Sequence, residues 1–380
     1  MRRTGYASLP LHGGRAPRWL VTRMTKLARQ IVAIIVDEFG REEFLRRISE
    51  PHWFQALGCV LGYDWHSSGV TTVLTGVLKS AIEPEEFGIA VCGGKGKTSL
   101  RTPNEIVEVG EKFSFSTDKI CKLQYASRMS AKVDNTAIQA GYPLYHHAFF
   151  VCEDGKWAVV QQGMNVADRT ARRYHWLCEK VENFVVEPHN AIVGDVKREK
   201  ALDMTAKESE NCRKISVDLV KEKPRKVMNL IKSIRPAYQK SLLEWIPKNR
   251  KEKDYVINFL YMPLNLNWDA VKRAYEFQPK NYEELLGIRG VGPATVRGLA
   301  LISELIYGEP PSWKDPVKYS FAYGGKDGVP YPVNRKAMDE SIKILERAVE
   351  EAKIGDKEKI RSLQRLQIFI SQAQSNKVKS

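Results

Sequence analysis

The sequence lacks the features that mark secreted, zinc-stabilised or membrane-spanning proteins. Its six cysteines lie about thirty residues apart, and no two form a C-x-x-C pair, which argues against a disulfide framework or a structural zinc site. It has no run of about 18 apolar residues, and its first residues do not form the apolar core of a signal segment. We therefore expect a cytoplasmic protein without a membrane span.

Two residue types are absent from long stretches. Glycine does not occur between Gly194 and Gly287, and histidine does not occur after His189. The glycine-free stretch is rich in helix formers and holds 17 Lys and Arg against 8 Asp and Glu between Lys197 and Lys253, in a chain of net charge +15. Such a surface attracts polyanions, although an ordinary basic protein is the alternative. Titratable chemistry near neutral pH is expected before this stretch, where all the histidines lie.

The apolar periodicity predicts an α+β fold that is predominantly helical. Between Trp19 and Gly40 apolar residues recur every three or four positions, which is typical of a helix. The segment YHHAFFVCEDGKWAVVQQGM has strand-like runs on both sides of Asp154-Gly155, which predicts a β-hairpin. We expect a mixed α/β domain over residues 1–194, a basic helical connector over 195–265 and an all-helical domain over 266–380.

Residues 281–306 resemble a helix-hairpin-helix motif. A short helix is followed by the hairpin segment GIRGVG and by a second helix that begins near Pro293. Glycine permits positive φ and close approach, so main-chain N–H groups at the start of a helix can point at a phosphate. Such contacts bind DNA without reading its sequence, whereas the alternative is a glycine-rich turn between core helices. We expect Ile288 and Val291 to pack the hairpin onto its helices, and Arg289 and Arg297 to add charge to the phosphate contact. The residues expected to form the DNA-binding site are Ile288, Arg289, Gly290, Val291, Gly292 and Arg297, together with Lys97.

The hairpin lacks the chemical groups that accompany it in a large group of DNA glycosylases. Those enzymes carry a catalytic lysine two residues after the last glycine and an essential aspartate after the second helix. Ala294 and Asn334 stand at these places here. The motif therefore predicts a DNA clamp, with any chemistry elsewhere.

Two other segments contain candidate nucleophiles. VCGGKGKTS fails the phosphate-loop pattern because Val91 stands where the first glycine is required, but it offers Lys95 and Lys97. SRMSAKVDNTAIQAGYPLYHH places Lys132 and Asp134 ahead of two histidines. An amine nucleophile needs a lowered pKa and a proton shuttle. The alternatives are a flexible basic loop and an exposed helical lysine paired with a carboxylate.

A metal site is not favoured. His146 and His147 are adjacent and would point to opposite faces of a strand, so they cannot easily share one ion. His66 with Asp64 and one of the pair would be the remaining set, but its spacing matches no known pattern. We expect no metal and no other cofactor.

The chain as a whole resembles family 763 of the domains of unknown function. The resemblance rests on these strings, in this order, followed by the hairpin: RRTGYASLPLHGGRAPRWL, WFQALGCVLGYDWHSSGVTT, GGKGKTS, SRMSAKVDNTAIQAGYPLYHH, WAVVQQGMN, ARRYHW and EPHNAI. The family occurs largely in archaea and thermophilic bacteria, and a member has been described as a lyase acting on abasic sites in DNA. The resemblance implies the same activity here, with a lysine that forms a Schiff base and no metal.

For that reaction we rank Lys132 first as the nucleophile, then Lys95 and Lys97, with Asp134 or His147 as proton shuttle. The α-amine of Met1 is a further candidate, because α-amines titrate near pH ~8. The alternatives are a bifunctional glycosylase and lyase acting on another lesion, a metal-dependent nuclease, and a non-catalytic DNA-binding repair factor. The expected partner is DNA, with no membrane and no small-molecule cofactor.

Overall fold

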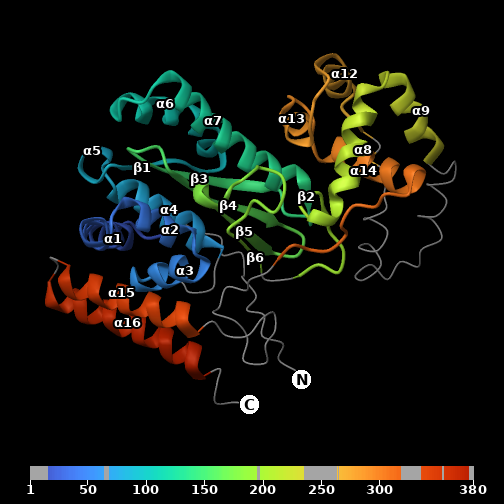
Figure 1. Ribbon diagram of the computed structural model, residues 1–380. Coiled ribbons are helices and arrows are strands. Elements are labelled where there is room, and N and C mark those ends of the chain that lie inside the picture. The colour runs from blue at the N-terminus through green and yellow to red at the C-terminus, as the bar shows by residue number, and fades with distance from the viewer. Residues whose placement is uncertain are drawn as a thin grey trace.

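The protein has an α+β fold that is predominantly helical and contains one larger antiparallel sheet (Figure 1). The computed structural model describes residues 16–63, 68–194, 197–234, 263, 265–317, 335–352 and 355–375. Among the helices of these residues, none combines the length and the apolar character needed to cross a membrane.

The sheet has five strands in the order β1-β3-β4-β5-β6, and all neighbouring strands are antiparallel. Its strands are β1 (Ile89–Lys95), β3 (Leu144–Cys152), β4 (Trp157–Asn165), β5 (Thr170–Leu177) and β6 (Ala191–Gly194). The expected β-hairpin is confirmed, because β3 and β4 pair across a turn at residues 153–156. Gly155 has φ +88° in this turn, a conformation that L side chains rarely adopt.

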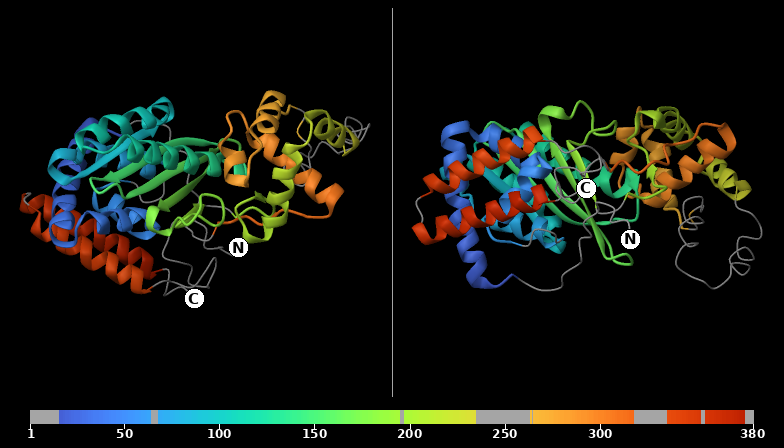
Figure 2. Two further views of the ribbon diagram at one scale, coloured as in Figure 1. Left: turned by 45° about the horizontal axis from the view of Figure 1, so that its top comes forward. Right: turned by 90° about the horizontal axis from the view of Figure 1, so that it is seen from below.

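Helices cover both faces of the sheet (Figures 1 and 2). One face packs against α1 (Arg18–Phe39), α2 (Arg41–Ser49), α3 (Pro51–Val60), α4 (Gly69–Ala81) and the short α5 (Pro84–Phe87). The other face packs against α6 (Thr102–Lys112) and α7 (Thr117–Lys132). The helix expected from Trp19 to Gly40 is confirmed as α1, whose buried residues Met24, Leu27, Ile31 and Ile35 have the predicted spacing.

A second group of helices lies beside the end of α7 (Figure 1). It consists of α8 (Glu210–Lys221), α9 (Pro224–Ile234), α12 (Trp268–Phe277), α13 (Tyr282–Gly287) and α14 (Pro293–Tyr307). A short ribbon of β2 (Ile138–Gln139) and β7 (Leu202–Asp203) joins this group to the sheet. α8 shares its core with α12, α13 and α14, so the described part of the expected connector belongs to this helical group.

The last two helices lie at the other side of the molecule (Figure 2). α15 (Arg335–Glu351) and α16 (Asp356–Ser375) pack against α1 and α3, with Leu345, Val349 and Leu366 buried in the same core. The sequence predicts that α15 and α16 share one helical domain, residues 266–380, with the hairpin. An amphipathic pattern identifies the face that a helix buries but not the helix that covers it. The sequence alone therefore does not predict that α1 and α3 cover these two helices.

Candidate functional site

The segment between α13 and α14 is a tight hairpin held from inside by apolar residues. Val291 is fully buried and Ile288 packs half-buried against the same core, as the sequence predicted. Gly290 has φ +90°, and a Cβ there would lie 2.6 Å from Nη2 of Arg273 and 2.8 Å from Nδ2 of Asn267. Gly290 is therefore required by the fold itself.

Gly292 has no comparable internal role. Its φ is −124°, and a Cβ would meet nothing closer than the main-chain oxygen of Gly290 at 3.9 Å. It precedes α14, whose N-terminus has no side-chain cap, and the first N–H groups of a helix lack intrahelical acceptors. Arg289 is exposed beside it, with its carbonyl oxygen accepting from Arg273 at 2.8 and 3.0 Å. The outer surface of the hairpin thus combines open space, N–H donors and a cation.

One side of α7 runs along this hairpin. The Tyr125 hydroxyl donates to Glu283 Oε1 of α13 at 2.5 Å. One turn further along α7, the sulfur of Met129 lies 4.0 Å from the position of a Cβ on Gly287. Beyond the end of α7, Gln139 Nε2 donates to the main-chain oxygen of Pro293 at 2.9 Å. α7 therefore contacts the chain before the hairpin, at Glu283 and Gly287, and β2 contacts the chain after it, at Pro293.

Lys132 lies between these contacts, in the last turn of α7. It is half-buried, and burial lowers the pKa of its amine. Among the residues that the structure describes, no carboxylate or other group forms an ion pair or hydrogen bond with this amine. The alternative of an exposed lysine paired with a carboxylate does not fit this environment. A desolvated, unpaired amine is what a lysine nucleophile requires.

The next five residues form a π-helical turn, η2 (Val133–Ala137), which contains the fully buried Asp134. Its Oδ2 accepts from the Trp176 indole at 3.0 Å and from the Gln161 amide, and its Oδ1 is bonded to the His189 ring. Asp134 therefore faces the sheet. Side chains two positions apart on a helix point in roughly opposite directions, so Lys132 is expected to point away from the sheet. Single π-helical turns within helices often occur at functional sites.

The two adjacent histidines face opposite sides of the sheet, as expected. His147 is bonded to Ser127 of α7 at 2.9 Å and to Gln161 Oε1 at 2.8 Å, which places it in the same buried network as Asp134. His146 shares a hydrogen bond of 2.9 Å with Thr75 of α4. Burial lowers the pKa of both rings, that of His146 to about 3. Both rings are therefore neutral near pH 7.

Of the other candidate lysines, Lys95 lies on the α4 side of the sheet, and Lys97 lies in the short helical turn η1 (Gly96–Arg101) that follows β1. Lys95 ends β1 opposite His146, and its amine lies 6.0 Å from the centroid of the Tyr145 ring. Lys95 and Lys97 are both exposed. The main-chain N–H of Gly93, two residues before Lys95 in β1, donates to the Glu105 carboxylate at 2.7 Å, so this donor is not available to an anion. The structure brings Asp134 and His147 together but does not join these two lysines to them.

The guanidinium of Arg297 occupies a different position from the one expected. Its Nε donates to Gln139 Oε1 at 2.9 Å, and burial lowers its pKa. The side chain thus links α14 to β2, next to the outer surface of the hairpin. Met1, Asp64, His66 and Asn334 lie outside the described residues.

The family model described as "Protein of unknown function (DUF763)" matches residues 5–333. The chain belongs to this family. The matched region of this DUF763 protein contains the sheet, Lys132 and the hairpin, and it ends just before α15. No match was found among curated proteins or among solved structures.

The part of the DUF763 chain that the structure describes contains no group of three His, Cys, Asp or Glu side chains arranged to hold a metal ion. Asp64 and His66, the ligands of the metal alternative, lie outside that part. All six cysteines are free thiols, and four of them are buried.

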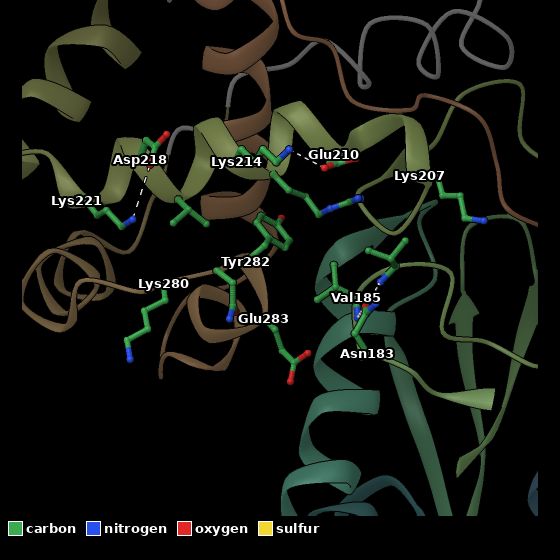
Figure 3. A pocket seen from close by; sticks show the side chains of 14 residues that line it. Asn183, Val185, Lys207, Glu210, Lys214, Asp218, Lys221, Lys280, Tyr282 and Glu283 are labelled. Carbon is green, nitrogen blue, oxygen red and sulfur yellow. Dashed lines mark hydrogen bonds and ion pairs between the residues drawn. The ribbon is translucent and has the colours of Figure 1, made fainter. Parts of the chain in front are cut away.

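Sequence reasoning missed a groove of about 890 Å³ between α8 and α13 (Figure 3). Lysines line it from both sides: Lys207, Lys214 and Lys221 near or on α8, and Lys280 before α13. Lys214 and Lys221 are seven residues apart, two helical turns on one face, and this spacing was visible in the sequence. The groove also contains the carboxylates of Glu210, Asp218 and Glu283, which neutralise part of its positive charge.

Proposed function

We propose that the protein is an abasic-site lyase that binds the DNA backbone on the α13–α14 hairpin and reacts through Lys132. The observation that carries the proposal is the environment of Lys132: its amine is half-buried and unpaired among the described residues, and it lies on a segment flanked by Met129, which approaches Gly287, and Gln139, which bonds to Pro293. A strand held by the hairpin would have its sugars close to this amine.

The reaction needs a neutral amine and no bound metal. The Lys132 amine attacks C1′ of the ring-opened abasic sugar, and loss of water gives a protonated Schiff base. This cation makes the C2′ proton acidic, so that a base removes it and the 3′ phosphate leaves by β-elimination. Water then hydrolyses the imine and regenerates the lysine. The lowered pKa of Lys132 favours the first step by increasing the neutral fraction near pH 7.

The buried network gives Asp134 and His147 a role that supports this amine. Each accepts or shares hydrogen bonds with Gln161, and Asp134 holds the π-helical turn that follows Lys132. We assign both residues to positioning Lys132, because their polar atoms are engaged on the sheet side of α7. Lys95 remains the second candidate nucleophile.

The hairpin supports a DNA partner bound through its phosphates. Arg289 is exposed on the hairpin, and Gly292 leaves its outer surface open to close approach. Backbone contacts of this kind do not depend on base sequence. The proposal places the protein in the cytoplasm, where its free thiols would remain reduced.

Borohydride trapping on DNA with a single abasic site tests the proposal. We expect the wild-type protein to form a covalent adduct and Lys132→Gln to form none, while Lys95→Ala, Lys97→Ala and Lys26→Ala, a control at an exposed lysine of α1, still form it. Full trapping by Lys132→Gln would reject Lys132 as the nucleophile. Cleavage that EDTA abolishes, without any adduct, would favour a metal-dependent nuclease instead.

A further inference from the structure

A small aromatic pocket opens on the surface of α7, next to the groove between α8 and α13. It has a volume of about 460 Å³ and is lined by Cys121, Lys122, Tyr125, Ala126, Trp157, Cys178, Val181 and Phe184. Trp157 is stacked between Phe149 at 5.6 Å and Phe184 at 6.0 Å, and Tyr125 meets Phe184 edge-on at 5.5 Å. Tyr125 is 38% exposed, and Phe184 is partly exposed. The pocket therefore presents the partly exposed rings of Tyr125 and Phe184 to solvent, with the buried Trp157 stacked behind Phe184.

Glu283 connects the pocket to the groove. It lines the groove (Figure 3), and its carboxylate accepts from the Tyr125 hydroxyl at 2.5 Å and from the main-chain N–H of Phe184 at 3.3 Å. On the groove side, Lys280 is exposed, and no ion pair engages its amine among the described residues. On the pocket side, Lys122 lies at the rim, and its amine forms an ion pair with Asp118 at 2.7 Å. Cations thus lie on both sides of the aromatic rings.

The floor of the groove contains a polar group without a partner. Tyr282 is 6% exposed, and its hydroxyl has no hydrogen-bond partner in the part of the chain that the structure describes. A buried hydroxyl in this state costs free energy unless a ligand or water satisfies it. Tyr282 and Lys280 both come from the segment that leads into the hairpin.

We infer that the aromatic pocket accepts one unpaired nucleobase, while the lysine-lined groove holds the phosphates of the same strand. A positively charged groove beside aromatic rings is the usual arrangement for binding single-stranded nucleic acid, because every base can stack on a ring. The occupant is a nucleobase rather than a protein segment because the pocket is small and flat-walled and its surroundings carry ammonium groups, which suit a polyanion. The protein therefore binds unpaired nucleotides next to its reaction site.

This inference rests on the proposed function only for the choice of DNA and for the distance to Lys132. Seven residues of α7 separate Tyr125 from Lys132, roughly 10 Å along a helix axis. A base in the pocket would therefore belong to a nucleotide close to the abasic sugar, not to the abasic site itself.

Alkylation of Cys121 tests the occupant of the pocket. Cys121 is exposed and lines the pocket, whereas four of the other five cysteines are buried and Cys178 is partly so. Two oligomers of equal length and charge are compared at saturation, a single-stranded DNA and a polymer of tetrahydrofuran abasic nucleotides that has no bases. Alkylation of Cys121 by iodoacetamide is measured by mass spectrometry over time. We expect only the DNA to slow this alkylation. Equal protection by both oligomers, or protection by neither while both bind, would overturn the inference.

Substitutions at Tyr125 separate stacking from the hydrogen bond to Glu283. Tyr125→Leu removes the ring and should weaken single-stranded DNA binding about 5- to 150-fold, with no change for the base-free polymer. Tyr125→Phe keeps the ring and should bind DNA like the wild type. Trp19→Leu, at a 61% exposed ring on α1, is the matched control and should have no effect. Wild-type affinity in Tyr125→Leu, or equal losses for both oligomers, would contradict base stacking.

The two proposals can fail separately. Absence of a borohydride adduct with intact base-dependent protection of Cys121 would reject the lyase reaction but keep the pocket. A normal adduct without that protection would reject the pocket but keep the reaction.

Discussion

The amide of Gln139 donates to the main-chain oxygen of Pro293 at 2.9 Å, so the ribbon after the π-helical turn is bonded to the first residue of α14. The same side chain accepts from Arg297 Nε at 2.9 Å. One residue thus fixes the hairpin relative to the turn that contains Asp134 and follows Lys132. If the hairpin holds DNA and Lys132 reacts with it, the precision of their spacing depends on Gln139.

Gln139→Ala should reduce reactivity more than affinity. The variant loses three hydrogen bonds, those to the main-chain oxygens of Thr136 and Pro293 and the one from Arg297, each contributing about 1 kcal/mol to stability, and it leaves the outer surface of the hairpin unchanged. We expect the rate of borohydride trapping to fall about tenfold, since small errors in position are costly for catalysis. Binding to undamaged DNA, measured by fluorescence anisotropy, should change little. Gln139→Glu keeps the oxygen that accepts from Arg297, so its trapping rate should lie between those of the wild type and Gln139→Ala. Parallel losses of affinity and trapping rate would show that Gln139 acts only on binding.

The two glycines of the hairpin should respond differently to alanine. Gly290→Ala forces a Cβ into φ +90° and against Arg273 and Asn267, which should lower the free energy of unfolding by about 1–3 kcal/mol. Gly292→Ala has room inside the protein and should change stability by less than about 0.5 kcal/mol. Because its methyl group would face a bound phosphate, Gly292→Ala should weaken binding to all DNA sequences alike.

Urea unfolding and anisotropy measure these two effects independently. Unchanged DNA affinity in Gly292→Ala would mean that the phosphate does not approach this glycine. A loss confined to abasic DNA would place the reaction itself at the hairpin.

Local patterns predicted the parts of the fold that local forces determine. The apolar spacing of Leu27 and Ile31 marked the buried side of α1, and Asp154-Gly155 marked the turn between β3 and β4. The packing of Ile288 and Val291 also followed from their places in the hairpin. In each case the residues that decide the structure lie within a few positions of one another.

The remaining features depend on contacts between distant segments. Arg172 and Asp315 form a fully buried ion pair at 2.6 Å although 143 positions separate them. Likewise, the sequence pointed to Lys132 but could not show that Met129 and Gln139, on either side of it in the chain, contact the two ends of the hairpin segment. The aromatic pocket combines rings from α7, β4 and the segment after β5, and no spacing rule connects such residues.

The buried histidines should make the protein sensitive to acid. Burial lowers the pKa of His146 to about 3 and that of His52 to about 4, and it also lowers those of His147 and His175. In the unfolded chain these rings take up a proton below pH ~6.5. Between that pH and the lower folded-state pKa values, the unfolded state binds more protons, so stability falls as the pH falls.

Each such histidine should remove about 1.4 kcal/mol of stability per pH unit below ~6.5, until its folded-state pKa is reached. Urea unfolding at pH 7 and pH 5 measures this loss. His146→Gln retains a group that can bond to Thr75 but cannot titrate, so its loss between the two pH values should be smaller than that of the wild type by about 2 kcal/mol. An identical pH dependence in His146→Gln and the wild type would show that the His146 ring does not resist protonation in the folded protein.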